Sequence, residues 1–481
     1  MSADEVVQAS GNAAWMLISA SLVLLMTPAL SLFYGGMTGR RSVLNMMMMS
    51  FGALGVVSVV YVLWGWSMSY GTQSLWGVVA NPLEFLGLRN SITDDAGNYL
   101  AGSSGYANVI DVSFQLTFAV ISTALISGAL AGRVKFSTWL VFTAAWSTLV
   151  YFPLAHMVWG GGLLSHSEQS LSARIFGVSD GEATIAPIDF AGGTVVHISA
   201  GTAALILALL VGRREGFPHI PQRPHNLPLV ILGAALLWFG WFGFNGGSAF
   251  AADGLAGLAW LNTTAATAAA MLGWLVVERL RDGRPTSLGA ASGVVAGLVT
   301  VTPAAGDLTP LTSLLIGVVG GGLACLGVGL KYRFGYDDSL DVVGVHLVAG
   351  LWGTVGVGLL ATDAGLLTGG GTAGLQLFVV QIVIAVVAMI FTAAVTAVIA
   401  LVLRATMGWR IAREEEAEGI DAAEHRETGY DLTGPEIRRG NLIATGAETP
   451  ALGLTATTAG PDGPADTTAD TGTDLPDQTK E

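Results

Sequence analysis

Eleven long, mostly apolar stretches divide this chain, and they allow little other than a membrane fold. They cover approximately residues 13–34, 42–70, 111–131, 137–160, 189–212, 227–250, 258–280, 287–305, 311–331, 341–362 and 374–404. A helix needs about 20 such residues to cross the ~30 Å hydrocarbon core. Gly and Ala occur throughout without a period of two, which argues against a β-barrel. The sequence predicts an all-α membrane protein with eleven transmembrane helices.

The composition agrees with this prediction. Hydrophobic residues make up 52% of the chain and charged residues 12%, against roughly 25% charged residues in an average soluble domain. The net charge of -14 comes mainly from residues 405–481, which hold 16 acids and 6 bases. The single cysteine, Cys325, excludes an intramolecular disulfide and a cysteine-based metal cage. We expect no cofactor and no metal site.

Basic residues predict the orientation. The first twelve residues carry Asp4 and Glu5 but no Lys or Arg, so the first apolar stretch is interpreted as a retained helix rather than a signal peptide. With the N-terminus outside, twelve Lys and Arg lie in inner loops and only Arg89 and Arg174 in outer ones. Because cytoplasmic loops retain basic residues, we expect a multi-pass protein of the cell inner (cytoplasmic) membrane, with its C-terminus inside.

The pattern V-H-x-x-A-G occurs twice, with His197 in the fifth apolar stretch and His346 in the tenth. Five helices are an odd number, so a second copy of the unit enters the membrane upside down. We therefore predict two five-helix inverted repeats plus a long last helix, an arrangement typical of transporters with a midplane site. A chance match in a chain rich in Val, Ala and Gly, or a simple helix-to-helix hydrogen bond, is the alternative. Ionisable groups at that depth usually mark a pathway.

Aromatic residues near the outer ends of three stretches suggest a path for a cation. Phe244 and Ser248 share one helix face, Phe118 lies about seven residues into the third stretch, and Trp159 ends the fourth. A desolvated cation on an aromatic face gains ~2 kcal/mol. Interfacial Trp and lipid-facing Phe are the ordinary alternative.

Two aspartates each open a stretch that contains one of the histidines. Asp189 begins the fifth stretch and Asp341 the tenth. A carboxylate at a helix N-terminus caps free amides and complements the helix dipole. We predict that both aspartates are caps.

Four segments carry a resemblance to a known family. They are DFAGGTVVHISAG at 189–201, AHMVWGGGLL at 155–164, WFGFNGGS at 241–248 and DDSLDVVGVH at 337–346. They resemble the ammonium transporter (Amt/Mep/Rh) family, most closely its bacterial Amt branch, from about Ala13 to Leu432. The resemblance implies a homotrimer of eleven-helix subunits, each with its own pore, and a transporter rather than an enzyme.

The resemblance also implies roles for eight residues. Trp159 and Ser248 correspond to the outer ammonium recruitment site, Phe118 and Phe244 to a stacked gate, and His197 and His346 to paired pore imidazoles. Asp189 corresponds to the carboxylate that organises the recruitment region, and Trp241 to a pore residue beside the histidines. The chain departs from the family at Gly132, where a glutamate is usual, which predicts a missing cytoplasmic charge pairing. Leu347 and Val348 replace smaller residues, which predicts a narrower inner vestibule.

These features favour transport in which ammonium is recruited outside, loses its proton and passes as ammonia between the histidines. Potassium has no proton to lose and pays the full cost of desolvation. An ammonium sensor signalling through its tail and an Rh-like gas channel are the alternatives within the family. A third alternative makes the two histidines axial ligands of a haem.

The rest of the chain is predicted to lie outside the membrane. Residues 1–404 form the transporter domain, 405–444 a cytoplasmic regulatory segment and 445–481 a disordered acidic tail. The stretch 409–432 has a helix-forming composition. Its resemblance to the family's regulatory segment implies a PII-class signal-transduction protein as a partner, whereas an ordinary solvated tail is the alternative.

Overall fold

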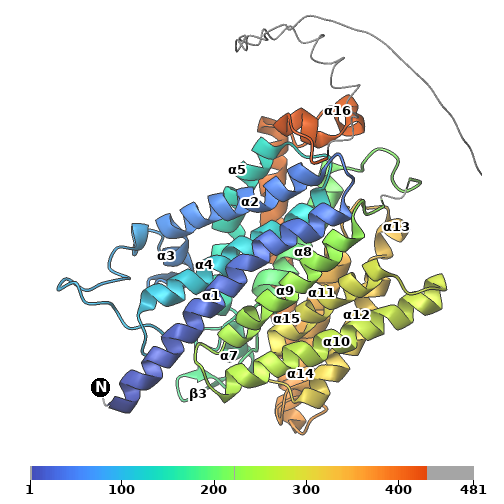
Figure 1. The fold of residues 1–481 in the computed structure, drawn as a ribbon. Helices are drawn as coiled ribbons and strands as arrows, with labels where there is room; N and C mark the ends of the chain where they lie inside the picture. Colours follow the sequence, from blue (N-terminus) through green and yellow to red (C-terminus); the bar gives the residue numbers. More distant parts are fainter. Residues whose placement is uncertain (1–2, 221–222, 431–481) are drawn as a thin grey trace, which may run out of the picture. The chain divides into compact units, whose positions relative to one another are not determined.

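The computed structural model describes residues 3–220 and 223–430. Within them, eleven helices are long and apolar enough to cross a membrane, as predicted (Figure 1). The spans, in order, are α1 (Ala3–Met37); α2 (Val43–Val60), η1 (Tyr61–Gly65) and α3 (Trp66–Tyr70); α4 (Asn108–Leu125) and η3 (Ile126–Leu130); α5 (Phe136–Trp146), η4 (Ser147–Tyr151) and α6 (Phe152–Val158); η5 (Gly193–Ile198) and α8 (Ser199–Val211); α9 (Leu227–Gly247); α10 (Gly254–Asp282); α11 (Ser287–Val301) and η6 (Thr302–Ala304); α12 (Pro310–Gly327) and α13 (Leu330–Phe334); η7 (Val343–Val348) and α14 (Ala349–Leu360); and α15 (Gly371–Thr406).

The remaining elements are short and lie between or after the spans. They are the hairpin β1 (Ser74–Leu75) with β2 (Val79–Ala80), η2 (Leu86–Leu88), α7 (Leu171–Phe176), the hairpin β3 (Val178–Ser179) with β4 (Glu182–Ala183), α16 (Arg413–Glu418) and η8 (Asp421–His425). The first span begins well before the predicted residue 13 because polar residues outside the apolar run still continue the helix.

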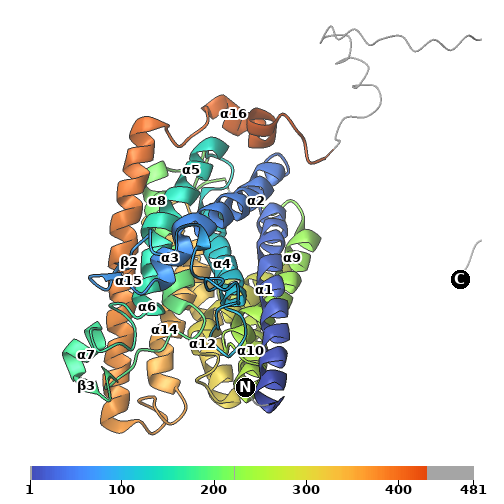
Figure 2. The same cartoon turned by 90° about the vertical axis from the view of Figure 1, so that its left-hand side faces the viewer.

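Corresponding spans of the two five-helix sets pack against each other in opposite directions. The first span, α1, packs along the sixth, α9 (Figures 1 and 2). Gly233 lies against Phe33, whereas Gly243, ten positions later, lies against Leu22. The partner residue number falls as the α9 number rises, so the two helices are antiparallel. This packing is what inverted repeats require.

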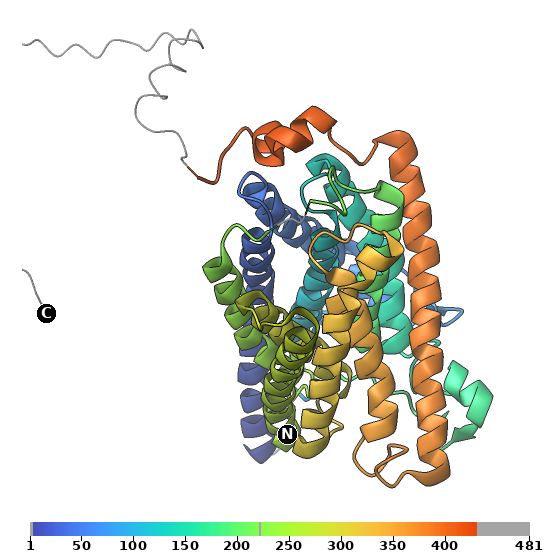
Figure 3. The same ribbon diagram turned by 90° about the vertical axis from the view of Figure 1, so that its right-hand side faces the viewer.

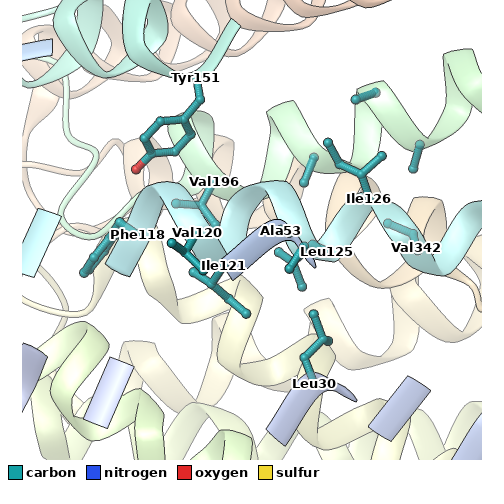
Figure 4. Packing of buried hydrophobic residues seen from close by; sticks show 14 of the residues in the cluster. Leu30, Ala53, Phe118, Val120, Ile121, Leu125, Ile126, Tyr151, Val196 and Val342 are labelled. Atoms are coloured by element: carbon teal, nitrogen blue, oxygen red, sulfur yellow. The ribbon is translucent and has the colours of Figure 1, made fainter. Parts of the chain in front are cut away.

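The middle of the protein is closely packed around α4. Figure 4 shows side chains from several helices against it, and the labelled residues include Leu30 of α1, Ala53 of α2, Tyr151 of η4 and Val196 of η5. These side chains are at most 1% exposed. Phe118 lies at one end of this packed region, which fixes its ring by dense packing.

The C-terminal segment runs back across the ends of α2 and α5. After α15, which Figure 3 shows as the long orange helix, it forms α16 and η8. The carboxylate of Asp421 accepts hydrogen bonds from the amides of Leu44 (3.1 Å) and Asn45 (2.8 Å), and Glu424 accepts one from Phe136 (2.9 Å). Two carboxylates distant in sequence thus satisfy the first amides of two membrane helices.

Within the described part of the predicted helical stretch 409–432, which ends at residue 430, the helix is broken rather than continuous. Gly419 has a φ of 116° and separates α16 from η8. Such a backbone conformation favours glycine and ends a helix. The predicted disordered tail, residues 445–481, lies outside the described residues.

Candidate functional site

A cavity of about 460 Å³ opens near Trp159. Four of the predicted site residues line it: Trp159, Ser248, Phe118 and Asp189. Trp159 and Ser248 directly follow α6 and α9, Phe118 lies in α4, and Asp189 lies in the segment before η5. The structure thus brings together residues separated by up to 130 positions, and we call this space the outer cavity.

Trp159 and Asp189 are tied to each other in the wall of the outer cavity. The indole Nε1 of Trp159 donates to the main-chain oxygen of Asp189 at 2.9 Å. The Asp189 carboxylate accepts from the amides of Gly192 (3.1 Å) and Thr194 (3.0 Å), and also from the Gly193 amide and the Thr194 hydroxyl. Asp189 is therefore the predicted cap. The Trp159 N–H is occupied, so the indole offers its ring to the cavity rather than a donor.

The two phenylalanines are stacked below Trp159. The rings of Phe118 and Phe244 have centroids 4.1 Å apart with an interplanar angle of 23°. Both side chains are at most 1% exposed, and Trp159 meets Phe118 edge-on at 6.2 Å. Ser248 donates its hydroxyl to the Phe244 carbonyl at 2.7 Å, which leaves the oxygen lone pairs as acceptors.

The two histidines meet beyond the phenylalanine stack. Their Nδ1 atoms are 3.4 Å apart and their rings are stacked with centroids 5.5 Å apart. Phe244 lies 6.2 Å from His197, centroid to centroid. A hydrogen bond between two Nδ1 atoms requires one to carry a proton and the other to be bare. His197 Nε2 is buried without a hydrogen-bond partner among the described residues.

Trp241 supports this pair from α9. Its indole stacks on His197 with centroids 5.5 Å apart and an interplanar angle of 15°. The indole Nε1 donates to the Thr302 hydroxyl at 2.9 Å, and that hydroxyl donates to the Leu298 carbonyl at 2.7 Å. Trp241 therefore has a fixed orientation, which holds one face of His197.

The glycines that end the two V-H-x-x-A-G copies explain why the rings come so close. A Cβ at Gly201 would lie 2.5 Å from the Leu347 amide nitrogen, and one at Gly350 would lie 3.0 Å from the His197 Cβ. Each glycine sits four residues after its own histidine and faces the other histidine's helix. The contacts run in opposite order along the two helices, so these helices are antiparallel and cross where they have no side chain between them.

Comparison with known proteins places this arrangement in a family. A model described as Ammonium Transporter Family matches residues 14–430. An ammonium transporter of Mycobacterium bovis is 48% identical over 445 residues, which cover 88% of this chain and 90% of that protein. The chain belongs to the ammonium transporter family.

Other relatives and solved structures agree. An ammonium transporter of Aquifex aeolicus is 45% identical, with 88% of this chain and 94% of that protein covered. A structure described as Sensor Amt Protein matches with a TM-score of 0.76 at 27% identity, covering 88% of this chain and all of that one. Saccharomyces cerevisiae Mep2 matches with a TM-score of 0.71 at 29% identity, covering 84% and 90%. The protein is thus a multi-pass membrane protein of the transporter class.

The prediction that Asp341 caps the tenth span is wrong. Asp341 forms an ion pair with Lys331 at 2.6 Å, and Asp338 accepts the Val343 amide at 2.7 Å instead. Asp341 has a φ of 67°, so the chain turns between it and the helix. A capping carboxylate has to reach the free amides at the start of the helix, and here Asp338, three positions before Asp341, does so.

The charge pairing predicted to be missing at Gly132 stays a prediction, and the residue after it takes part in a different ion-pair cluster. Arg133 is fully buried 4.0 Å from Asp337, which also binds Arg214 at 2.7 Å. Burial alone raises the pKa of Asp337, but hydrogen bonds from Arg214 and the charge of Arg133 hold that pKa below its usual value. Gly132 itself has a φ of 80°, a conformation that favours glycine.

The prediction that Leu347 and Val348 narrow the inner vestibule stays a prediction. Leu347 is 8% exposed and its backbone packs on Gly201. Val348 lies within η7 and its side chain approaches Gly327 of α12. Both residues take part in packing between the tenth span and its neighbours.

Sequence reasoning missed several residues of the outer cavity. Its lining also includes Trp66, Tyr70, Asp111, Gln115, Phe190 and Phe250. Asp111 and Gln115 were detectable in part, because they lie seven and three residues, respectively, before Phe118 on the same helix and carry polar groups into an apolar stretch. The others come from separate spans and loops, and only the fold brings them to the cavity.

Proposed function

We propose that this protein moves ammonium across the cytoplasmic membrane by recruiting the cation in the outer cavity and conducting it as ammonia past the histidine pair. The family membership supports ammonium as the substrate. The observation that carries the finer proposal is the order of the residues: cavity, stacked phenylalanines, then two hydrogen-bonded imidazoles.

Recruitment uses two groups that favour a small cation with N–H donors. The Trp159 ring attracts positive charge through its face, and its N–H is already engaged by Asp189. The Ser248 oxygen accepts a hydrogen bond from ammonium because its own proton points to the Phe244 carbonyl. Potassium shares the charge but has no hydrogen to donate.

The phenylalanine stack makes proton loss the easier route. Phe118 and Phe244 are in contact, so a passing substrate has to push the two rings apart and lose its hydrating water. A bare charge in an apolar, water-poor site is costly, and this cost disappears when ammonium gives up its proton. Potassium has no such escape, which supports exclusion by the same residues.

The histidine pair then accepts the proton that ammonium gives up, binds the ammonia that remains and relays the proton. One ring donates from Nδ1 and leaves its Nε2 bare; the other accepts at Nδ1 and carries its proton on Nε2. The pair therefore presents one acceptor and one donor to guests, and a proton accepted at one outer nitrogen is released at the other. The same contact argues against a haem, because the touching rings and the Trp241 stack leave no gap for a porphyrin.

Orientation, assembly and regulation complete the proposal. The distribution of Lys and Arg supports an outer N-terminus and an inner C-terminal segment. Family membership supports a homotrimer of independent pores. The C-terminal segment, anchored by Asp421 on α2 and Glu424 on α5, is the proposed contact for a PII-class regulator.

Uptake of methylammonium by vesicles that contain the purified protein tests the transport proposal, with and without excess potassium. We expect saturable uptake that potassium does not inhibit and that His346→Ala abolishes. Potassium inhibition, or equal uptake in vesicles without protein, would contradict the proposal.

A sensor is the second candidate, because one structural relative is described as Sensor Amt Protein. A sensor binds the cation in the same cavity but conducts little. Tight ammonium binding with no uptake above protein-free vesicles would favour it. Uptake of neutral methylamine without saturation would favour an Rh-like gas channel instead.

A further inference from the structure

Gln381 is a fully buried polar side chain in the first third of the long apolar helix α15. Its amide makes three hydrogen bonds, all to main-chain groups. Oε1 accepts from the Ile188 amide at 2.9 Å, and Nε2 donates to the Ile188 oxygen at 2.7 Å and to the Thr354 oxygen at 2.9 Å. A side-chain amide is the neutral group that offers an acceptor and two donors together.

Ile188 directly precedes the residue on which the outer site depends. Asp189 holds the Trp159 indole through its main-chain oxygen and caps the helix of His197 through its carboxylate. Any shift of Ile188 therefore moves both the recruiting ring and the start of that helix.

The same short segment is fixed from its other end by η6. The Phe190 amide donates to the Pro303 oxygen at 3.1 Å, and the Ala191 amide donates to the Thr302 oxygen at 3.2 Å. The segment is thus an extended chain pinned after Asp189 by main-chain groups and before it by one side chain. Gln381 is the only one of these contacts that a substitution can remove without changing the backbone.

The third hydrogen bond ties in the other histidine's helix. Thr354 lies eight residues after His346 on α14, and its side chain is in close contact with Gly193, the first residue of η5. Gln381 therefore joins α15, the tenth span and the segment before the fifth span. One side-chain amide is therefore bonded both to the segment before the helix of His197 and to the helix of His346.

We infer that Gln381 is a positioning residue for ammonium recruitment, which keeps the Asp189 segment in register with Trp159 and with the two histidine helices. The inference rests on the proposed function for its transport readout. Without the amide, the N–H and C=O of the half-buried Ile188 lose their side-chain partner. An unpaired main-chain group with limited access to water is costly enough to displace its segment. Gln381 touches no substrate in this scheme and acts through Asp189.

The test compares Gln381→Leu, Gln381→Glu and the control Thr392→Val in full-length protein in vesicles. Thr392 is a fully buried residue of the same helix whose hydroxyl has no hydrogen-bond partner among the described residues. We expect Gln381→Leu to raise the KM for methylammonium about tenfold with a smaller change in maximal rate, as the loss of supporting hydrogen bonds does at other binding sites. Gln381→Glu, protonated when buried, keeps one donor and an acceptor and gives a smaller rise. Thr392→Val leaves both values unchanged.

Amide hydrogen exchange in the peptide that covers residues 184–192 provides a readout independent of transport. We expect faster exchange in Gln381→Leu and wild-type exchange in Thr392→Val. An unchanged KM with unchanged exchange, or a fall in maximal rate alone, would overturn the inference. If wild-type vesicles take up no methylammonium, the proposed function fails, while the exchange comparison still decides whether Gln381 holds the segment. If Gln381→Leu does not insert, Gln381→Glu carries both measurements.

Discussion

The two helices that carry His197 and His346 are alike in their middles and different at their beginnings. Both open with a π-helical segment that contains the histidine, and both have a glycine four residues later. At its start, the first is capped by Asp189, which also holds Trp159. The second is capped by Asp338, beside the Lys331–Asp341 ion pair.

The comparison shows which feature the two repeats share, the glycine at the helix crossing, and which feature differs between them, the surroundings of the capping aspartate. The crossing of the two helices needs the same glycine on both sides, so the repeat persists there. Because the two helices are antiparallel, their beginnings lie at opposite ends of the crossing. One beginning supports the wall of the outer cavity, and the other is surrounded by buried charges, among them Arg133, Asp337 and Lys331.

Replacing either histidine tests the shared middle and has the largest expected effect. In His197→Ala and His346→Ala, the proton relay loses one of its two rings. We expect methylammonium uptake to fall about a hundredfold or more in each, the range for the loss of a positioned acid or base. Uptake assays in vesicles measure this, and His219→Ala in an exposed loop is the control. Unchanged uptake and potassium exclusion in both variants would remove the proposed role.

The glycine pair gives the next largest effect. A Cβ at Gly201 meets the Leu347 backbone, whereas one at Gly350 meets the His197 side chain at a longer distance. We expect Gly201→Ala to lose about 1–3 kcal/mol of stability and most of its uptake, and Gly350→Ala to lose less of both. Thermal unfolding in detergent measures the order, with Gly55→Ala, which has open space around it, as the control. A larger loss of stability in Gly350→Ala than in Gly201→Ala would show that other residues determine how closely the two helices cross.

The two caps give a moderate effect that separates the two beginnings. Asp189→Ala and Asp338→Ala each remove a cap, which costs about 0.5–2 kcal/mol of stability. We expect only Asp189→Ala to raise the KM for methylammonium, because only Asp189 supports Trp159. Paired measurements of melting temperature and KM decide this. Equal KM changes in both variants would contradict the division between the two ends.

The smallest effect concerns pH at two neighbouring aspartates. Burial raises the pKa of Asp338 to about 6, with Lys331 opposing and Asp341 adding to that rise. An acid with a raised folded pKa is stabilised as pH falls from about 6 towards its unfolded value, near 3.9. We therefore expect the melting temperature of wild type minus that of Asp338→Asn to rise as the pH is lowered from about 6 to about 4.

The pKa shift of Asp337, and hence its effect on stability as the pH falls, has the opposite sign to that of Asp338. Its pKa in the folded protein lies below the usual value because Arg214 and Arg133 outweigh burial. Its contribution is complete above the unfolded pKa and is lost as pH falls through the lower folded value. We expect the difference between wild type and Asp337→Asn to stay constant from pH 8 to 5 and to shrink below about pH 4. Parallel slopes for the two variants would contradict these assignments.

Much of the fold was predictable because span length and hydropathy depend on local sequence. The repeated pattern around His197 and His346 also predicted that the two residues pair. Because the repeat contains an odd number of helices, the two histidine helices run in opposite directions. The π-helical segments were not predictable, because one extra residue per turn leaves no mark in an apolar run. The cap at Asp338 was also predictable from the repeat, because Asp338 precedes His346 by eight residues, as Asp189 precedes His197. Asp341 lies nearer the start of the helix, but its left-handed backbone conformation turns it away from the free amides. Gln381 stands out as a polar residue in α15, but its partner Ile188 lies 193 positions away.

The contact between Gly201 and the Leu347 backbone has a consequence for engineering this protein. Main chain against main chain has no alternative rotamers, so the gap between the two imidazoles cannot be enlarged by repacking neighbouring side chains. Variants selected to admit bulkier amines should therefore alter the crossing angle of the fifth and tenth spans, through substitutions at their ends, and leave the residues that line the conduit as they are.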